Sequence, residues 1–258
     1  MGIDSRKIRG GICRGGEKKK REMQTLILAG GLGTRLQKAV RHYPKPMALI
    51  NDRPFLEYLI LHLKKYNLTE IVLCIGYLGE KIKEYFQDGA KWGVKIEYSQ
   101  EAKPLGTGGP IKLADNFIKN NNFLVLNGDS YLNIDLNELI EFHKLQKALA
   151  TLALVEINKP DRYGLVEVDK DYHITSFREK GAAAKSNLIN GGVYIFHKSI
   201  FNFIPEGKIS LEKDIFPKLI GKRFYGKPYR TYFIDIGVSE DYNRIQKEFW
   251  KLKNAYSF

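Results

Sequence analysis

Hydrophobic residues from position 24 onward form short apolar runs that alternate with amphipathic stretches. The runs, of which Leu26-Ile27-Leu28 is the first, are apolar on both faces, which is typical of buried parallel strands. The amphipathic stretches carry apolar residues at helical spacing, as Phe55, Leu59 and Leu63 do. The pattern predicts strands at 24–29, 70–75, 94–99, 123–126 and 149–156, and helices at 54–65, 81–87, 110–116 and 136–146.

Strands that alternate with helices favour an α/β fold with a doubly wound, mainly parallel, Rossmann-like sheet and right-handed crossovers. The rhythm changes after residue 157, where shorter strands with hairpin connections predict a small antiparallel section. The elements expected there are strands at 163–169, 173–177, 192–197 and 229–234 and helices near 199–204, 210–219 and 239–251. We therefore expect one domain over 23–258, composed of two halves, 23–156 and 157–258.

A glycine-rich turn directly follows the first strand. Because its glycines lack side chains, backbone N–H groups can close on an anion, and the helix expected after the turn adds its positive end. Arg35 then offers several donors to phosphate oxygens. The turn comprises Ala29, Gly30, Gly31, Leu32, Gly33, Thr34 and Arg35. Taken alone, the glycines could instead form a tight strand-to-helix connection that binds no ligand.

This turn differs from the two best-known phosphate-binding loops. Its Gly33-Thr34-Arg35 stands where a P-loop has Gly-Lys-Ser/Thr, and Leu36 stands at the third glycine of the dinucleotide fingerprint. Shortly afterwards Lys45 lies between Pro44 and Pro46, which stiffen the backbone and hold the lysine near the turn. Together the two segments resemble the sugar-phosphate nucleotidyltransferases, also called nucleotide-sugar pyrophosphorylases.

Two aspartates follow apolar strands and are candidate metal ligands. Asp129 comes after the buried run at 123–126, and Asp235 follows an apolar run that ends at Ile234. A carboxylate at the end of a buried strand is costly unless it is paired, metal-bound or used in a turn. Two such carboxylates beside triphosphate oxygens suit Mg²⁺. The resemblance implies the same role, because Gly-Asp and Asp-Ile-Gly motifs hold the metal in this family.

The resemblance also assigns residues to the two substrates. It implies that the glycine-rich turn binds the nucleotide, that Glu101 lies near the base or ribose, and that Gly106 and Thr107 contact the base. In the second half, it implies that three segments bind the sugar 1-phosphate. The residues concerned are Tyr163 and Gly164, Glu179 and Lys180, and Asn190. A turn tyrosine, a surface ion pair and a glycine bulge are the alternative interpretations of these segments.

Composition and charge narrow the function classes. The chain has 258 residues, of which 43% are hydrophobic and 28% charged, as expected for a globular protein. Its net charge of +13 makes nucleic-acid binding an alternative function. However, residues 1–22 carry eight Lys or Arg and three acidic residues, so they account for +5 of this charge. We interpret 1–22 as a disordered basic extension or an expression-vector remnant ahead of a natural start at Met23. The remaining charge is dispersed and suits a cleft for a polyanionic nucleotide.

The same features indicate the compartment and the partners. No apolar run approaches the roughly 20 residues of a membrane span. The two cysteines, Cys13 and Cys74, form no paired motif, so a cytoplasmic location is expected. We expect small-molecule substrates and neither nucleic acid nor a membrane as partner, and the sequence leaves open whether the protein forms a homodimer.

Within the family, the chain most resembles the D-glycero-D-manno-heptose 1-phosphate guanylyltransferases, through the runs at 188–194 and 210–214. This resemblance implies transfer of GMP from GTP to a heptose 1-phosphate, giving pyrophosphate and GDP-heptose for bacterial surface glycans, with Mg²⁺ as cofactor. Arg35, Lys45 and Asp129 would act on the reacting phosphates. A mannose-1-phosphate guanylyltransferase or another nucleotide-sugar pyrophosphorylase is the nearest alternative. The non-enzymatic alternative is an inactive regulatory subunit that binds a nucleotide sugar.

Overall fold

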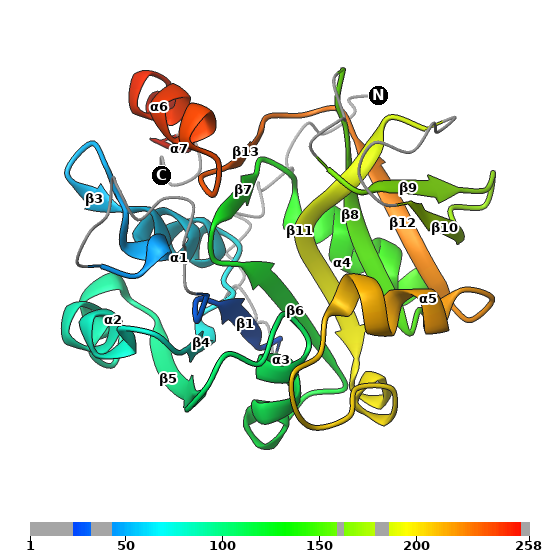
Figure 1. Cartoon of the computed structure of the whole chain (residues 1–258), viewed down its shortest axis with the longest axis horizontal. Helices are drawn as coiled ribbons and strands as arrows, with labels where there is room; N and C mark the ends of the chain where they lie inside the picture. The colour runs from blue at the N-terminus through cyan, green and yellow to red at the C-terminus, as the bar shows by residue number, and fades with distance from the viewer. Residues whose placement is uncertain (1–22, 32–42, 159–162, 179–185, 254–258) are drawn as a thin grey trace, which may run out of the picture.

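A large mixed sheet runs through this computed structural model (Figure 1), which describes residues 23–31, 43–158, 163–178 and 186–253. Over these residues, nine strands join along the path β10-β9-β11-β6-β1-β4-β5, with β8 pairing β11 and β12. The strands are β1 Thr25–Leu28, β4 Glu70–Ile75, β5 Lys95–Gln100, β6 Asn122–Asn127, β8 Ala150–Glu156, β9 Leu165–Val168, β10 Ile174–Arg178, β11 Leu188–His197 and β12 Phe224–Tyr229.

Four consecutive strands of the sheet run parallel. Strands β6, β1, β4 and β5 are parallel neighbours, and β12 is parallel to β8. Strand β11 runs antiparallel to β6 and β8, and β9 and β10 form an antiparallel pair beside it. The α/β fold class, with a mainly parallel sheet and a small antiparallel section, is therefore confirmed.

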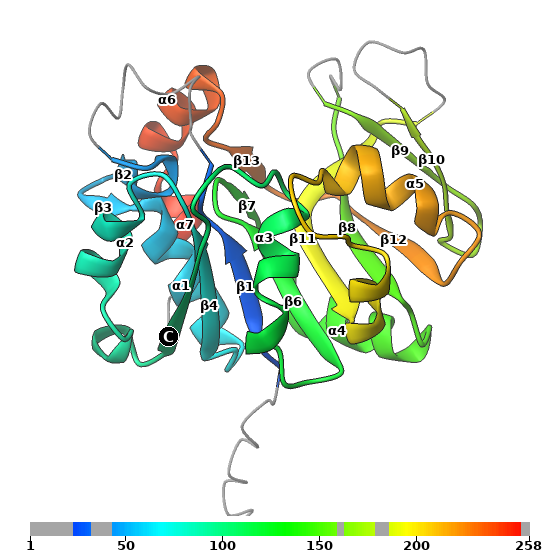
Figure 2. The ribbon, with the colours of Figure 1, turned by 60° about the horizontal axis from the view of Figure 1, so that its bottom comes forward.

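Helices cover both faces of the sheet, as the doubly wound prediction requires. They are α1 Phe55–Lys65, α2 Gly79–Phe86, α3 Gly109–Leu113, α4 Leu136–Leu145, α5 Phe216–Leu219, α6 Ser239–Lys247 and α7 Trp250–Lys253. Successive residues of β1 point to opposite faces: Ile27 packs in a cluster with α1 and α4, and Leu26 in a cluster with α3 and α5. Figure 2 looks onto the face that carries α3 and α5.

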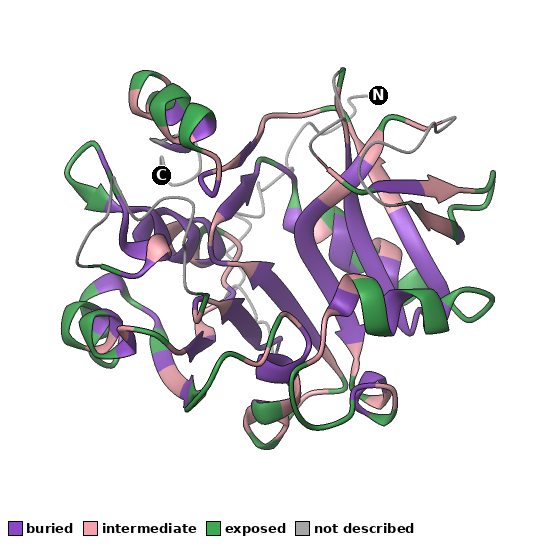
Figure 3. Ribbon diagram, viewed as in Figure 1, coloured by how far each residue is buried: buried purple, intermediate pink, exposed green. Residues whose placement is uncertain are grey.

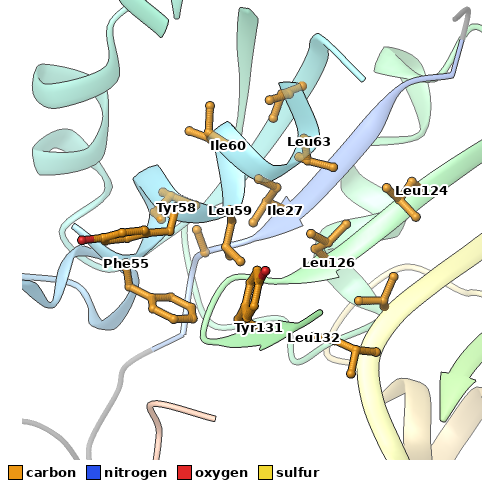
Figure 4. Close-up of a cluster of buried hydrophobic side chains, with 14 of the residues drawn as sticks. Ile27, Phe55, Tyr58, Leu59, Ile60, Leu63, Leu124, Leu126, Tyr131 and Leu132 are labelled. Atoms are coloured by element: carbon orange, nitrogen blue, oxygen red, sulfur yellow. The ribbon is translucent and has the colours of Figure 1, made fainter. Parts of the chain in front are cut away.

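The central strands are buried because helices cover them on both sides. Figure 3 shows β1, β6 and β11 largely buried, and Leu26 and Ile27 are 0% exposed. On one face, Leu59 and Leu63 of α1 lie toward Ile27 (Figure 4). The apolar face of this helix, rather than its backbone propensity, therefore fixes it on the sheet.

Two small sheets lie outside the main one. Strand β7 (Ser130–Leu132) pairs antiparallel with β13 (Phe233–Asp235), and β2 (Leu49–Ile50) pairs with β3 (Arg53–Pro54). The β7–β13 pair brings a segment near the end of the fold back to the carboxyl end of β6. It thereby places two stretches about a hundred positions apart side by side.

The strand predicted at 229–234 is wrong. The structure has β12 at Phe224–Tyr229 and then β13 from Phe233. Gly226 and Pro228 lie inside β12, and both residue types count against a strand when only the sequence is read. Strand β12 pairs with β8 at the edge of the sheet. A missing backbone N–H costs little at an edge, so the strand tolerates Pro228.

Several other bounds also differ. The helix predicted at 239–251 is divided into α6 and α7. The helix predicted at 210–219 begins with a π-helical turn at Leu211–Ile215. The helix predicted near 199–204 is a 3₁₀ turn at Lys198–Asn202. Strand β11 begins at Leu188 rather than at 192, because its glycines form a bulge inside the strand.

The main sheet continues across residue 157. Strand β11 of the second half pairs with β6 and β8 of the first half. The interpretation of residues 1–22 falls outside the described part of the chain.

In that described part, no helix combines the length and the apolar character that crossing a membrane requires.

Candidate active site

The carboxyl ends of β1 and β6 lie side by side and carry the first candidate residues. The Gly128 N–H donates to the Leu28 carbonyl oxygen at 2.9 Å. A Cβ at Gly128 would lie 2.6 Å from that oxygen, so only glycine permits this close approach. The contact places Asp129 beside Gly30 at the start of the glycine-rich turn, as expected for the ends of neighbouring parallel strands.

A cavity of about 350 Å³ opens over these strand ends. Pockets of roughly 300–1,000 Å³ are typical of small-molecule sites. The predicted residues that line it together are Gly30, Gly31, Lys45, Glu101, Gly106, Thr107 and Asp129. Further lining residues, to which the sequence analysis assigned no substrate contact, are Leu28, Pro46, Pro104, Pro110 and Asn127. Segments separated by up to a hundred positions thus converge on one cavity.

Lys45 reaches the carboxylates of the site from a rigid turn. Pro44 is extended, and Lys45–Met47 forms a 3₁₀ turn in which Pro46 and Met47 are buried. The Lys45 ammonium donates to Asp129 Oδ2 at 2.5 Å and lies 3.8 Å from Asp235 Oδ1. The structure therefore brings together three residues predicted from separate motifs.

Asp129 and Asp235 are held by the β7–β13 pair. The Ile236 N–H donates to the Asp129 carbonyl oxygen at 2.9 Å, and the Gly237 N–H donates to Asp235 Oδ1 at 2.7 Å. Burial raises the pKa of Asp235 above its usual range, and the negative charge of Asp129 raises it further. The Lys45 ammonium and the Gly237 N–H act in the opposite direction.

Glu101 also lines the cavity and lies against the backbone of Gly30, at the glycine-rich turn. A Cβ at Gly30 or Gly76 would lie 2.9 Å or 2.7 Å from its Oε1, so the carboxylate fits only because both positions are glycine. Its Oε2 accepts from the Leu105 N–H at 3.0 Å. Burial raises the pKa of Glu101, and the Leu105 hydrogen bond partly offsets this shift.

The loop at 104–109 is anchored by the second half of the chain. Gly106, at φ +79°, forms a bridge with Ile209, and the Gly108 N–H donates to the Ile209 carbonyl at 2.8 Å. Thr107 Oγ1 donates to Glu212 at 2.9 Å and accepts from the Leu211 N–H at 2.8 Å. The Thr107 side chain therefore holds the cavity wall, and its assignment as a base contact stays a prediction.

Asn190 belongs to the glycine bulge of β11. Its side-chain oxygen accepts from the Gly192 N–H at 3.0 Å, and its amide donates to the Tyr194 hydroxyl at 2.9 Å. The same hydroxyl lies 3.5 Å from Asn127, which lines the cavity. The sequence analysis gave no role to Asn127, which directly precedes the Gly-Asp motif, or to Tyr194, which ends the run at 188–194 and contacts Asn127.

Tyr163 lies beside β13 and α6. Its hydroxyl donates to Asp241 of α6 at 3.3 Å, and its ring packs edge-on against Phe233. Neither Tyr163 nor the exposed Gly164 lines the cavity. The sugar contact predicted for them is not tested by this arrangement and stays a prediction.

The remaining predicted residues lie outside the described part of the chain. They are Gly33, Thr34, Arg35, Glu179 and Lys180. Ala29 is described: it is buried, and its N–H donates to the Cys74 carbonyl at 2.8 Å. Its backbone is therefore held in the sheet directly before the turn.

In the part of the chain that the structure describes, the site combines the Lys45 ammonium, the two aspartate carboxylates that face it and the Glu101 carboxylate in the cavity wall. Among the described residues, no group of three or more His, Cys, Asp or Glu side chains is arranged to hold a metal ion. Asp129 and Asp235 alone would supply two hard oxygen ligands and leave other positions for substrate or water oxygens. Such an arrangement suits the binding of a phosphorylated ligand better than nucleophilic catalysis by a side chain.

Comparison with known proteins agrees with this geometry. The family described as nucleotidyl transferase matches residues 24–251. The chain is 47% identical over 221 residues to the D-glycero-alpha-D-manno-heptose 1-phosphate guanylyltransferase of Campylobacter jejuni, covering 85% of this chain and 97% of the relative. It is 43% identical over 229 residues to the protein with the same description from Aneurinibacillus thermoaerophilus, covering 88% and 98%.

A solved structure supports the same conclusion. The crystal structure of HddC from Yersinia pseudotuberculosis complexed with GMP-PN superposes with a TM-score of 0.79 at 36% sequence identity. The match covers 88% of this chain and 99% of that one. The likeness therefore extends over the whole sheet and both halves of the fold.

Proposed function

The chain belongs to the nucleotidyl transferase family, and we propose that it is a guanylyltransferase that transfers GMP from GTP to D-glycero-D-manno-heptose 1-phosphate. The products are GDP-heptose and pyrophosphate. The observation that carries the proposal is the single cavity that joins the glycine-rich turn, Lys45, Glu101 and Asp129. The descriptions of the two relatives and the guanine nucleotide of the neighbouring structure support the choice of substrates.

The part of the cavity wall that contains Glu101 suits a guanine base. Guanine carries an N–H and an amino group next to each other on its pairing edge, and both are donors. A carboxylate is a pure acceptor when ionised, so Glu101 can accept from this edge through the Oε1 atom that lies between two glycines. Adenine presents an acceptor where guanine presents its ring N–H, so it would leave the carboxylate without a full set of donors.

The reaction needs positioning and charge neutralisation rather than a side-chain nucleophile. An oxygen of the sugar 1-phosphate, which is already anionic, attacks the α-phosphorus of GTP. The new P–O bond forms as the bond to the α,β-bridging oxygen breaks, and pyrophosphate leaves with that electron pair. Lys45 can reach the reacting phosphates from its turn, and cationic contacts of this kind stabilise charge that develops in the transition state.

We propose Mg²⁺ as the cofactor and Asp129 and Asp235 as its protein ligands. The donor set fits, because Mg²⁺ prefers one or two carboxylates and takes its other ligands from phosphates and water. When bound, it would neutralise phosphate charge and orient the triphosphate. Arg35 and Lys180, which the family resemblance places on the phosphates, complete this proposal.

The test is a pyrophosphate-release assay with Mg²⁺. GTP, ATP, CTP, UTP and dTTP are each combined with heptose, mannose and glucose 1-phosphates. We expect release with GTP and heptose 1-phosphate to exceed every other pair, and Asp129→Asn to abolish it. A preference for mannose 1-phosphate would reassign the acceptor, and no release with any pair in folded protein would favour a binding subunit.

A further inference from the structure

The Lys45 ammonium lies between two carboxylates that the proposed function assigns to a metal ion. It contacts Asp129 Oδ2 at 2.5 Å and lies 3.8 Å from Asp235 Oδ1. The three side chains are only partly accessible, with Lys45 at 15%, Asp129 at 37% and Asp235 at 27% exposure. Within the described residues, no other cation forms an ion pair with either aspartate.

Two half-buried carboxylates on neighbouring strands need a positive charge between them. The β7–β13 pair fixes their backbones, because Asp235 lies opposite Ser130 and Ile236 bonds to Asp129. This pairing limits how far the two carboxylates can separate, and their repulsion is stronger in a partly dry site than in water. A lysine ammonium is a compact charge with several donors and can serve both carboxylates at once.

The fold leaves room for Lys45 in this position. A Cβ at Gly237 would collide with the Lys45 ammonium, so a side chain at 237 would push the lysine away from the aspartates. Gly237 is buried and its N–H holds Asp235, so the space is part of the site rather than open solvent. We call the position of Lys45 between the two carboxylates its docked position.

The docked lysine and a bound metal ion exclude each other. A magnesium ion would sit roughly 2.0–2.1 Å from a carboxylate oxygen, and Asp129 Oδ2 already faces the ammonium at 2.5 Å. Two positive charges in that space would also repel one another. The lysine can leave without unfolding its turn, since Pro46 and Met47 hold the backbone and the four-carbon side chain remains free to turn.

We propose that Lys45 acts as a stand-in cation, which holds Asp129 and Asp235 together in the metal-free protein and is displaced toward the substrate phosphates when a divalent ion binds. The inference rests on the metal site of the proposed function. Lys45 lines the cavity to which the proposed function assigns the nucleotide, so the displaced ammonium would have the phosphates of a bound nucleotide within its reach. Metal binding would thus release the lysine for its role in the reaction.

A permanent ion pair is the alternative, in which Lys45 only stabilises the fold. The two differ in the effect of removing the ammonium. Competition predicts that Lys45→Met binds a divalent ion more tightly than the wild type does, whereas a permanent pair predicts equal or weaker binding. Lys45→Arg keeps the charge and is expected to show no gain in affinity.

The experiment measures Mn²⁺ binding by the full-length protein without nucleotide, by the electron paramagnetic resonance signal of free Mn²⁺, together with thermal unfolding. We expect Lys45→Met to bind Mn²⁺ about tenfold more tightly than the wild type. In EDTA, its melting temperature should fall by about 3–6 °C, because the carboxylates then repel each other. Saturating Mn²⁺ should restore most of that loss, and the double variant with Asp129→Asn should lose the Mn²⁺ effect.

Lys227→Met is the matched control. Lys227 forms a 2.7 Å ion pair with Glu138 and is 19% exposed, but it lies on β12 outside the cavity. This variant should leave Mn²⁺ affinity unchanged. Unchanged or weaker Mn²⁺ binding by Lys45→Met, or no binding by it at millimolar Mn²⁺, would overturn the inference.

Guanylyl transfer measured on the wild type separates this result from the proposed function. Turnover of GTP without the affinity gain in Lys45→Met overturns the stand-in role and leaves the function intact. The affinity gain in Lys45→Met without turnover by the wild type supports the stand-in role and contradicts the proposed guanylyltransferase function.

Discussion

The Thr107 hydroxyl donates a 2.9 Å hydrogen bond to the Glu212 carboxylate, 105 positions further along the chain. The same hydroxyl oxygen accepts from the Leu211 N–H at 2.8 Å. This pair of bonds ties the loop that lines the cavity to a π-helical turn in the second half. The shape of the cavity wall therefore depends on both halves of the fold.

Thr107→Val tests that connection, because valine keeps the volume and loses the hydroxyl. The Leu211 N–H is then left without this partner, and we expect the free energy of unfolding to fall by about 1–3 kcal/mol. The KM for GTP should rise about 3–10-fold with little change in kcat, since a loosened wall weakens binding more than chemistry. Urea unfolding and steady-state kinetics measure both effects.

Thr107→Ser keeps the hydroxyl and should stay close to the wild type in both measurements. If Thr107→Val lowered kcat as strongly as it raised KM, the hydroxyl would be acting on the reaction itself rather than on the wall.

Gly128 and Gly31 form a second matched test. A Cβ at Gly128 would lie 2.6 Å from the Leu28 carbonyl oxygen, whereas a Cβ at Gly31 meets nothing within 4 Å. Gly128→Ala should destabilise the protein by about 2 kcal/mol, or about 4–8 °C in melting temperature, because the backbone of β1 must move. Gly31→Ala should leave the melting temperature within about 1 °C. Equal effects would mean that β1 and β6 do not approach as closely as described.

Glu101 makes stability depend on pH. Burial raises its pKa, so the folded state favours the protonated carboxyl and the ionised form destabilises the fold. Glu101→Gln should therefore raise the melting temperature at a pH above the raised pKa of Glu101. The gain should shrink as the pH falls through the raised pKa and vanish below about pH 4, the usual range of a glutamate. Thermal unfolding from pH 4 to 8 checks this, and a gain independent of pH would contradict it.

The same residue should select the base. If Glu101 accepts from both donors of guanine, the wild type should prefer GTP to ITP, whose base lacks the 2-amino group. Loss of one hydrogen bond to a charged group is worth about 1.5–3 kcal/mol, or about 10–150-fold in kcat/KM. Glu101→Gln should reduce this preference to a few-fold. An unchanged GTP/ITP ratio in the variant would place guanine recognition elsewhere in the cavity.

The parallel part of the fold could be predicted because its signals are local. The strand predicted at 70–75 coincides with β4 (Glu70–Ile75), and the helix predicted at 54–65 is α1 (Phe55–Lys65). Strands such as β7 and β12 could not be found in this way. Their extended state comes from pairing with distant strands, and β12 contains residue types that disfavour a strand locally.

The candidate site could be predicted as a set of residues but not as a geometry. The sequence indicated that Gly30 and Asp129 follow strands and that Lys45 lies near the glycine-rich turn, and all three line one cavity. It could not show that the Lys45 ammonium faces Asp129, 84 positions away, or that Thr107 points to Glu212. Such contacts depend on side-chain direction and on chain segments that meet only in the folded state.

The most direct test of the proposed reaction follows a phosphorus label. The protein is incubated with Mg²⁺, heptose 1-phosphate and GTP labelled with ³²P at either the α- or the γ-phosphorus, and the products are separated. Guanylyl transfer predicts that the α-label appears in GDP-heptose and the γ-label in pyrophosphate. A γ-label found on the sugar phosphate, or no label in any sugar nucleotide, would contradict the account.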